Sequence, residues 1–549
     1  MEEPQAKHQL QPASTPTESK AKGIRILLLI LAIAAFFLFA IPNAKASDDL
    51  AMVQVFEPDE SALFPVIMNM ARPKGDFVIF VKQFIVYERY NKGFPFYGPS
   101  ALILLLLRGL GLGDNIPVNF LALRQLVSVL PMLCGLLLLV WLQDRFRTYR
   151  SVLLFLFLLI TPAVVQNGFW WHPDGLTILL SALVLILLFK DQLSFGKYFN
   201  WAAAACGALT AAKTVGVFFF LTIAALLVWG LVEKRVTPGK VVFLGFRFIA
   251  IMGAAFLVSN PFLFSEWGRA GYLSMMRAQM SSLSSGYGVV YAKGISAAWP
   301  VMKENFGSAL FLLASLGICV YGIAANKARL LNVLILTWFI PLSLYVTVFS
   351  HFKYQYWLPV ALPLFSCWIL VFPEKIRGFT PKDWRGAVRI GLALLFLSQF
   401  FSFALQSQSM FSARVHRAEN NPYIQFSNTV AEKLAPVRGV PLRVYFDYRL
   451  YVPDTPGWKL STTYVPLSYA QIAAGDFDIL LLAAQRVRDY LSPEAEGVDP
   501  ALFAESQHFY RDVEQRTIEG FTFLGGDNAG LVFIRQGLCA QYFPGLPCE

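Results

Sequence analysis

Long apolar runs separated by short polar segments fill this chain as far as residue 405. The hydrocarbon core of a membrane is about 30 Å thick, so a helix needs roughly 17 to 25 apolar residues to cross it. The runs lie near residues 24–42, 119–142, 151–167, 174–190, 200–213, 214–233, 241–263, 306–324, 329–349, 354–373 and 386–405. The pattern therefore predicts a polytopic α-helical membrane protein with about eleven transmembrane helices.

Two long segments interrupt the series of predicted spans. The first covers about residues 43–118, and its apolar stretch 99–112 is too short to cross a membrane. We expect that stretch to lie along the membrane interface. The second covers about residues 260–305 and opens with Asn260-Pro261-Phe262.

From about residue 406 the composition changes to that of a soluble domain. Short apolar runs bounded by turn residues predict buried strands, and a longer periodic run predicts a helix. The predicted elements are strands over 442–446 and 477–482, a helix over 421–434, and a turn at 525–528 between two further strands. We predict a small C-terminal α/β domain over residues 406–549.

Composition and charge agree with a membrane protein. Hydrophobic residues make up 56% of the chain and charged residues 15%, which excludes an ordinary soluble globular protein. Lys and Arg gather in alternate short loops, as expected of the cytoplasmic side. They include Arg145, Arg147, Arg150, Lys190, Lys197, Lys234, Arg235, Lys240, Lys327, Arg329, Lys375, Arg377, Lys382, Arg385 and Arg389. These loops account for much of the net charge of +11, so we expect membrane lipids as partners and no nucleic acid.

This orientation places residues 1–23 inside, as a disordered cytoplasmic tail, and both long loops and the C-terminal domain outside. A cleaved signal peptide is the alternative for the first run, because bases precede it and Ala44-Lys45-Ala46 follows it. We expect a retained helix, a bacterial inner membrane and a periplasmic outer face. The chain has no Asn-X-Ser/Thr acceptor sequence, which disfavours an endoplasmic reticulum enzyme. Cys539 and Cys548 lie in the outer tail, and both a disulfide and two free thiols remain open.

Two acidic sites fall on the predicted outer face. Asp59 and Glu60 begin an apolar stretch, and Asp174 follows His172-Pro173 at the start of a predicted span. Acids at a helix start can simply favour its N-terminus. A carboxylate that is partly removed from water can instead act as a general base towards a hydroxyl or an amine.

Two isolated bases, Lys213 and Lys353, share this face despite the rule that keeps bases inside. A lysine at a membrane boundary commonly reaches out to water or lipid phosphates, which is one explanation for both. The other is that they neutralise a phosphate leaving group. Tyr354 and Tyr356 suit an interfacial aromatic belt or a platform for a sugar or a polyprenyl chain.

In their order and sidedness these features resemble the GT-C glycosyltransferases. The features are an acidic pair in the first outer loop, an acid in the next outer loop, a Gly-Ala-rich helix ending in Lys213, Asn260-Pro261-Phe262, a late basic-aromatic motif before Leu358-Pro359 and an outer α/β domain. The likeness covers about residues 24–536. It is nearest to the branch that contains protein O-mannosyltransferases and the lipid A aminoarabinose transferase.

The resemblance implies an inverting transferase that moves a sugar from a polyprenyl-phosphate donor to a lipid, glycan or protein acceptor at the outer face. It implies Asp59 as the base with Glu60 beside it, and Asp174 as the acid that positions the acceptor or a metal. The implied phosphate-binding residues are Lys213, Lys353 and His351, and the implied substrate-positioning residues are His172, Tyr354 and Tyr356. His172 has no counterpart that we can place in the family pattern, and His351-Phe352-Lys353 matches only loosely. Metal use differs among relatives, so the cofactor is unknown and a divalent metal stays open.

The rival hypothesis is a transporter or flippase with an outer sensor domain. Transporters place charges near the midplane, often on broken helices in repeated halves. Here the charges gather at one face and the sequence contains no internal repeat. A purely structural scaffold would leave the outward lysines unexplained, so we favour the glycosyltransferase.

Overall fold

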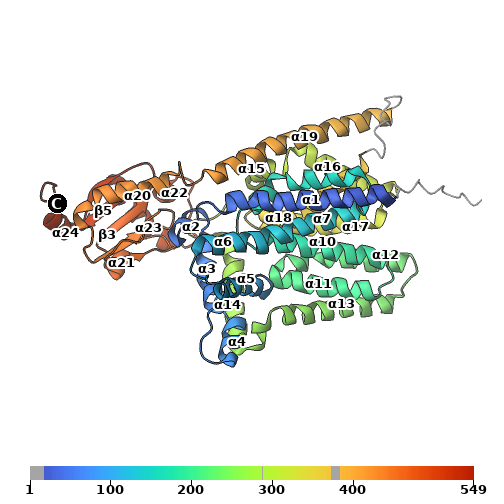
Figure 1. Ribbon diagram of the computed structural model, residues 1–549, viewed down its shortest axis with the longest axis horizontal. Helices are drawn as coiled ribbons and strands as arrows, with labels where there is room; N and C mark the ends of the chain where they lie inside the picture. The colour runs from blue at the N-terminus through green and yellow to red at the C-terminus, as the bar shows by residue number, and fades with distance from the viewer. Residues whose placement is uncertain (1–17, 287, 373–383, 549) are drawn as a thin grey trace, which may run out of the picture.

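The computed structural model describes residues 18–286, 288–372 and 384–548. It consists of a long helical bundle with a sheet-containing domain at one end (Figure 1). We call that end of the bundle the domain side. The predicted tail lies outside the described residues as far as residue 17, as do the bases Lys375, Arg377 and Lys382.

Helices occupy all eleven predicted runs. Within the described residues, six stretches are long and apolar enough to cross a membrane: α1 (Glu18–Asn43), Ile116–Asp144, Thr214–Val232, α13 (Pro238–Ser259), Arg329–Phe349 and Gly386–Val415. A seventh arises if α15 (Ile295–Phe306) and α16 (Ala309–Ala324), which are bent by 81°, form one span. The remaining runs hold shorter or more charged helices: α8 (Tyr149–Leu159), α9 (Pro162–Asn167), α10 (Asp174–Asp191), α11 (Lys197–Ala212) and α18 (Tyr354–Ser366). The number of eleven crossings is therefore not confirmed.

Several long stretches change their backbone geometry along the way. The stretch 116–144 consists of α6 (Ile116–Leu123), the π-helix η1 (Arg124–Val129) and α7 (Leu130–Asp144). The 3₁₀ segment η2 (Thr214–Phe219) precedes α12 (Phe220–Val232). Likewise α17 (Arg329–Leu344) continues into the π-helix η4 (Tyr345–Phe349), α18 is followed by the 3₁₀ segment η5 (Cys367–Leu370), and α19 spans Trp384–Val415. Short π-helical turns inside α-helices occur frequently at functional sites.

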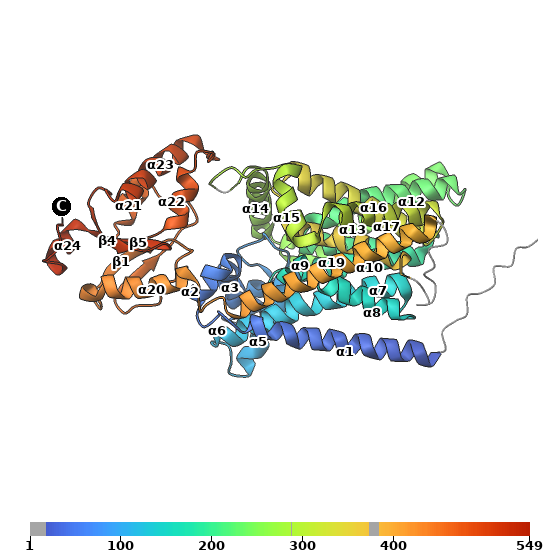
Figure 2. The same cartoon turned by 90° about the horizontal axis from the view of Figure 1, so that it is seen from above.

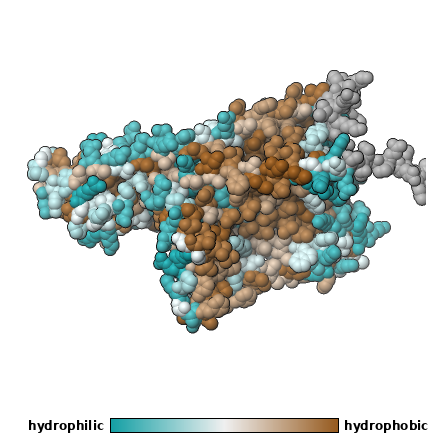
Figure 3. Space-filling view, viewed as in Figure 1, coloured by the Kyte–Doolittle hydropathy of each residue, from teal (hydrophilic) through white to brown (hydrophobic). Residues whose placement is uncertain are grey.

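An apolar band crosses the face of the bundle that Figure 3 shows. The band lies between hydrophilic surfaces at the domain side and at the far end. Large apolar side chains on it are widely exposed, among them Phe37 at 65%, Phe246 at 70% and Leu313 at 67%. Soluble monomers rarely expose contiguous apolar patches of this kind. The chain is therefore a multi-pass membrane protein.

Short helices cover the domain side between the bundle and the C-terminal domain (Figures 1 and 2). In the first long loop they are α2 (Leu50–Phe56), α3 (Pro58–Met70), α4 (Phe77–Ile85) and α5 (Phe94–Gly109). With 16 residues α5 is short for a span, as the sequence predicts for the stretch 99–112. The second long loop forms η3 (Pro261–Phe264) and α14 (Glu266–Ser285) before α15.

The C-terminal domain is built on a five-stranded sheet of order β2-β1-β3-β5-β4. The strands are β1 (Leu442–Phe446), β2 (Trp458–Ser461), β3 (Ile479–Ala483), β4 (Phe521–Gly526) and β5 (Gly530–Arg535). The helices are α20 (Pro422–Lys433), α21 (Tyr469–Gly475), α22 (Ala484–Leu491), α23 (Pro500–Gln515) and α24 (Gln536–Tyr542), with a 3₁₀ turn η7 (Ala435–Val437). Strand β1 is parallel to β2 and β3, whereas β5 is antiparallel to β3 and β4. The predicted small sheet domain is thus present, and its α20, β1, β3 and β4–β5 turn lie where the sequence predicted them.

Two further details bear on the predictions for this end of the chain. Helix α19 continues to Val415 before the sheet domain begins with α20. Cys539 and Cys548 form a disulfide, which answers the question that the sequence left open.

Candidate functional site

Asp174 is the centre of a buried cluster where α10 begins. Its side chain is inaccessible to solvent. One carboxylate oxygen contacts His172 Nδ1, and the other contacts the Lys213 ammonium. A buried carboxylate needs such partners because it has lost its hydration. The structure therefore brings together three of the predicted site residues and engages both oxygens of Asp174.

Irregular backbone holds this cluster in place. Helix α11 stops at Ala212, and Lys213 is extended before η2 begins. On the opposite side, Ser128 Oγ of η1 accepts a hydrogen bond from His172 N at 2.9 Å and lies 3.0 Å from the His172 carbonyl. A Cβ at Gly175 would overlap the Ser128 carbonyl, so glycine is required for α10 to approach η1 this closely. The Ser128 side chain of the π-helix thus fixes the backbone of the His172 loop.

Lys213 and Lys92 line a cavity of about 400 Å³, which we call the lysine cavity. Its other walls are mostly aromatic and aliphatic, and include Tyr90, Val217, Phe218, Tyr272, Met276, Met280, Leu342, Tyr345 and Val346. The Lys213 ammonium lies 4.2 Å from the ring centroid of Tyr356, a favourable cation–π arrangement. Apolar walls with a few polar groups are typical of small-molecule sites, and this combination suits an amphipathic molecule with an anionic head.

Lys92 reaches this cavity because of a close backbone approach. A Cβ at Gly93 would overlap the Ala211 carbonyl at the end of α11. Asn260 Oδ1 accepts a hydrogen bond from Phe94 N at 3.0 Å and caps this turn from the second long loop. The ring of Phe262 packs on Tyr90, with centroids 4.4 Å apart. The Asn-Pro-Phe motif that the sequence singled out therefore supports the turn that carries Lys92.

Lys353 adds a third cation from the segment between η4 and α18. Burial lowers the pKa of its amine, Asp59 opposes that shift, and Lys92 reinforces it. Among the described residues, the Lys353 amine makes no hydrogen bond or ion pair. His351, two residues earlier, stacks near Tyr291 with ring centroids 4.4 Å apart, and burial also lowers its pKa. Lys353 thus belongs to the electrostatic environment of both predicted acid sites, whereas His351 faces the second long loop.

Asp59 and Glu60 are neighbours in sequence but lie in opposite environments. Glu60 is fully buried and accepts hydrogen bonds from Arg124 Nε at 3.0 and 3.2 Å. It also accepts one from the backbone N–H of Trp171. Asp59 is exposed in the first turn of α3, and within the described parts of the chain it makes no hydrogen bond or ion pair. Of the two carboxylates, only Asp59 is open to a substrate.

A third acid, Glu57, connects this region to the helix that leads into the C-terminal domain. It forms ion pairs with Arg414 and Arg417, the latter at 3.4 Å. Arg414 also donates to the carbonyl of Phe169. These contacts tie the start of α3 to the end of α19.

His172 and the two tyrosines occupy different positions around the cluster. The ring of His172 is parallel to that of Trp170, with centroids 4.2 Å apart. Burial lowers the pKa of His172 to about 4, although Asp174 opposes the shift. Tyr356 lies against Lys213, as described above, whereas Tyr354 has Glu57, Asp174 and Arg414 among its electrostatic neighbours. His172 is thus neutral at neutral pH and orients Asp174.

Two solved structures share this architecture. ArnT from Cupriavidus metallidurans in the apo state is 12% identical, with a TM-score of 0.51 over 93% of this chain and 98% of that chain. The oligosaccharyltransferase AglB from Archaeoglobus fulgidus, in complex with an inhibitory peptide and a dolichol-phosphate, is 12% identical, with a TM-score of 0.50 over 91% of this chain and 73% of that chain. Both are members of the GT-C superfamily.

This chain has the GT-C fold. The resemblance that the sequence suggested is confirmed at that level. No protein-family model matches the sequence, and no curated protein sequence does. Identities this low establish the fold alone, and a fold hosts many activities, so the chemistry must be argued from the site.

The acids around this cluster do not fit a divalent cation as they are arranged. Within the described residues, no three or more His, Cys, Asp or Glu side chains gather as a metal site. Asp174 is engaged by His172 and Lys213, and Glu60 by Arg124. Divalent cations such as Mg²⁺ and Ca²⁺ need several oxygen ligands. We therefore derive no step through a metal.

Lys92, Arg124 and Glu57 were not among the site residues predicted from the sequence. Lys92 stands beside a glycine in a polar loop, and Gly93 was the one local signal that a close backbone approach was needed. Arg124 was a detectable anomaly, because a charge inside a predicted apolar run needs a partner. Its partner Glu60 comes from a distant part of the chain. Glu57 was visible as an acid next to the predicted pair, but nothing local pointed to its arginine partners.

Proposed function

We propose that this protein is an inverting glycosyltransferase of the GT-C type. It transfers a sugar from a polyprenyl-phosphate donor to a lipid, glycan or protein acceptor. The observation that carries the proposal is the convergence of Lys92, Lys213 and Lys353 beside a mostly apolar cavity, where only Lys213 has an anionic partner among the described residues. Such a surplus of cations beside an apolar cavity suits a lipid-linked phosphate.

The chemistry follows from the two kinds of residue present. Asp59 takes the proton from the acceptor hydroxyl or amine as that atom forms a bond to the anomeric carbon. The bond between the anomeric carbon and the phosphate oxygen breaks on the opposite face, and its electron pair leaves with the polyprenyl phosphate. The configuration at the anomeric carbon is inverted. The lysines stabilise the negative charge that develops on the leaving phosphate.

Several features support Asp59 as the base and the lysines as the ligands of the leaving phosphate. Asp59 is exposed and adds to the electrostatic environment of Lys353, as a base next to a leaving-group site should. Asp174 holds Lys213 where α11 ends, and Tyr356 covers the same amine. The AglB neighbour binds a dolichol-phosphate, a molecule of the donor-carrier class. Glu60 supports the base by fixing the start of α3 through Arg124.

We further propose that the site faces the periplasm from a bacterial inner membrane. The support is the distribution of Lys and Arg in alternate loops, which favours a cytoplasmic position for the end of the bundle opposite the C-terminal domain. Residues 24–405 would then form the catalytic membrane module and residues 406–549 a periplasmic domain.

A transporter or flippase is the second candidate, because α11 breaks at Lys213 and broken helices are typical of transporter binding sites. The position of the site favours the transferase. The acids and lysines gather around the starts of α3 and α5, since Glu60 accepts from Trp171 N and Gly93 approaches the Ala211 carbonyl, and both helices lie on the domain side of the bundle (Figure 1).

The direct test is transfer of radiolabelled sugar from a panel of undecaprenyl-phosphate hexoses and pentoses. The protein is purified in nanodiscs and mixed with lipid, glycan and peptide acceptors. The matched variants are Asp59→Asn and Asp48→Asn, both at exposed acids of the first long loop. Because general base catalysis contributes about 10²- to 10⁴-fold, Asp59→Asn should slow transfer by that factor and Asp48→Asn should leave it unchanged.

Thermal unfolding of both variants shows whether the fold survives. Equal transfer by Asp59→Asn and the wild type would remove Asp59 from the role of base. Donor movement across the bilayer of a liposome, with no transfer to any acceptor, would identify the protein as a transporter.

A further inference from the structure

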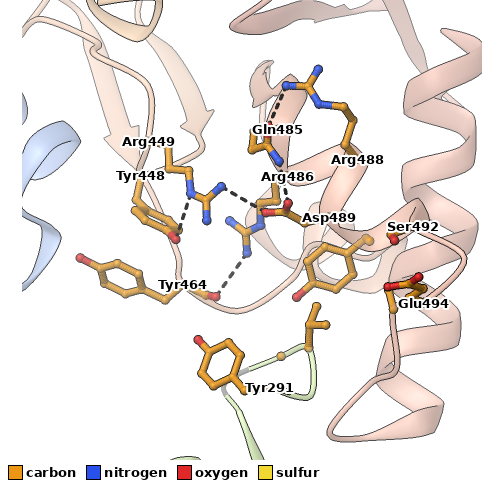
Figure 4. Close-up of a pocket in the computed structure, with 14 residues that line it drawn as sticks. Tyr291, Tyr448, Arg449, Tyr464, Gln485, Arg486, Arg488, Asp489, Ser492 and Glu494 are labelled. Carbon is orange, nitrogen blue, oxygen red and sulfur yellow. Dashed lines mark hydrogen bonds and ion pairs between the residues drawn. The ribbon is translucent and has the colours of Figure 1, made fainter. Parts of the chain in front are cut away.

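We infer that a second cavity, in the C-terminal domain, is the acceptor site and binds neutral sugar residues of a glycan. The inference rests on the proposed function, which leaves the acceptor class open. The cavity has a volume of about 570 Å³. Four tyrosines line it, namely Tyr291, Tyr448, Tyr464 and Tyr490, and we call it the tyrosine cleft (Figure 4).

The cleft has walls from two parts of the chain. The β1–β2 and β2–α21 connections and α22 with the residues after it form one wall, and the tip of the second long loop, Gly288 to Tyr291, forms the other. The tip is joined to the domain by hydrogen bonds from Val290 N to the Glu496 carbonyl at 2.7 Å and from Val498 N to the Gly288 carbonyl at 3.1 Å. The cleft is therefore a preformed site between the membrane module and the domain.

A ladder of planar polar groups crosses the floor of the cleft (Figure 4). Arg449 donates to the Tyr448 hydroxyl at 3.3 Å and to Asp489 at 3.1 Å. Gln485 donates to the same carboxylate at 2.8 Å, and Arg488 donates to Gln485 Oε1 at 2.9 Å. Because each group fixes the next, their remaining donors and acceptors keep set directions. Sugar hydroxyls both donate and accept, so a preorganised mixed ladder binds them at little entropic cost.

The charges of the cleft are balanced. Arg486 is held by Asp447 at 2.7 Å, and Arg449 by Asp489. Arg488, which is exposed, donates to the neutral Gln485, and the exposed Glu494 adds a negative charge elsewhere on the lining. An anionic acceptor would gain little from such a site, because two of its three arginines, Arg449 and Arg486, are already compensated. A neutral ligand with many hydroxyls fits it better.

The tyrosines supply the apolar part of the recognition. Tyr464 is 52% exposed, and its ring lies 4.8 Å from that of Tyr448. Tyrosine joins an apolar ring face to a polar edge, which matches the apolar C–H faces and the hydroxyl rim of a pyranose.

The cleft also leads to the reaction centre. The Tyr464 hydroxyl lies 3.5 Å from the carbonyl of Pro58, the residue before Asp59. On the other wall, Tyr291 contacts His351, which is two residues from Lys353. A glycan held in the cleft thus has one end beside the proposed base.

The test measures binding in the absence of donor, so it does not depend on transfer. The full-length protein in nanodiscs is titrated with neutral trisaccharides of glucose, mannose and N-acetylglucosamine, with tri-galacturonate, and with a Ser/Thr-rich peptide, and binding is followed by saturation-transfer NMR. The cleft variants are Tyr464→Ala and Arg488→Gln. Their controls are Tyr321→Ala, whose ring is 51% exposed on α16, and Arg511→Gln, exposed on α23.

At least one neutral trisaccharide should bind, and Tyr464→Ala should weaken it about two- to tenfold while Tyr321→Ala does not. No neutral binding, neutral binding that neither cleft variant changes, or a preference for tri-galacturonate or the peptide would overturn the inference. Glycan binding at the cleft without sugar transfer from any donor would contradict the proposed function, and the cleft would stand as a glycan-binding site but not as an acceptor site. Transfer that proceeds unchanged in Tyr464→Ala would support the proposed function and contradict the cleft as the acceptor site.

Discussion

The lysine cavity and the tyrosine cleft differ in whether their cations are paired with carboxylates. At the cavity, Lys92 and the nearby Lys353 have no anionic partner among the residues that the structure describes, and Lys213 shares one carboxylate with His172. At the cleft, Arg449 and Arg486 are each matched by an aspartate. Arginine side chains alone would have suggested an anion site at the cleft.

The difference shows that the pairing of cations, and not their number, indicates the charge of the ligand. A cation already compensated by a carboxylate is part of the framework, since an anionic ligand would have to displace that carboxylate. An uncompensated cation in a partly buried position costs free energy until an anion arrives. On this reasoning we propose a phosphate as the ligand of the cavity and a neutral molecule as the ligand of the cleft.

The largest expected effect is a loss of stability when a cation that is paired with a buried carboxylate is removed. Such a cation, which we call a framework cation, holds the fold and does not bind the ligand. Replacing Arg486 by Met should destabilise the C-terminal domain by about 3–5 kcal/mol, because it leaves the buried Asp447 uncompensated and frees the carbonyls of Thr463, Tyr464 and Val465. Limited proteolysis across a urea titration would measure the change. Arg488→Gln is the control and should leave the stability close to that of the wild type. Equal stability of Arg486→Met and the wild type would show that this arginine is not a framework cation.

A smaller effect is expected where the cation has no partner. Lys92→Gln should weaken binding of undecaprenyl phosphate about 10- to 100-fold, because a charged hydrogen bond contributes about 1.5–3 kcal/mol. The fold should be unchanged. Lys82→Gln, at an exposed lysine of α4 in the same loop, controls for the loss of a positive charge. Tryptophan fluorescence titration in nanodiscs gives both affinities, and matching values for the two variants would contradict a direct role for Lys92.

The smallest effect is a pH dependence. Burial lowers the pKa of the Lys353 amine below its ordinary value of 10.5, so its charge is lost at a lower pH than that of an ordinary lysine as the pH rises. The phosphodiester of the donor stays ionised throughout. Donor affinity in the wild type should fall by a few-fold to about tenfold as the pH rises through that lowered pKa, and the fall should be shallower in Lys353→Arg, because arginine stays protonated. Parallel profiles for the two proteins would exclude Lys353 as the titrating group.

The sequence predicted the helical bundle well because each apolar run has to be buried in lipid or in protein, whatever its neighbours. The helices α14 and α15 of the second long loop were not predicted, because their composition is mixed and the elements they pack against are distant in sequence. The grouping of His172, Asp174 and Lys213 was predictable from sidedness, since alternate loops meet on one face. The partners of Glu60 and Lys92 were not, because an ion pair to Arg124 and a backbone approach to Ala211 depend on how helices pack in three dimensions.

Helix α14 connects the lysine cavity to the tyrosine cleft. Tyr272, Met276, Gln279 and Met280 on this helix line the lysine cavity, and the helix ends at Ser285, just before the loop tip that walls the tyrosine cleft. Because α14 is one continuous helix, a shift of its cavity-lining part also moves its C-terminal end. Displacement of α14 by a carrier lipid would therefore alter the width of the cleft, and a glycan in the cleft would press back on the lipid with the same coupling free energy. If the proposed function holds, the protein would then sense, through one helix, whether donor and acceptor are both bound.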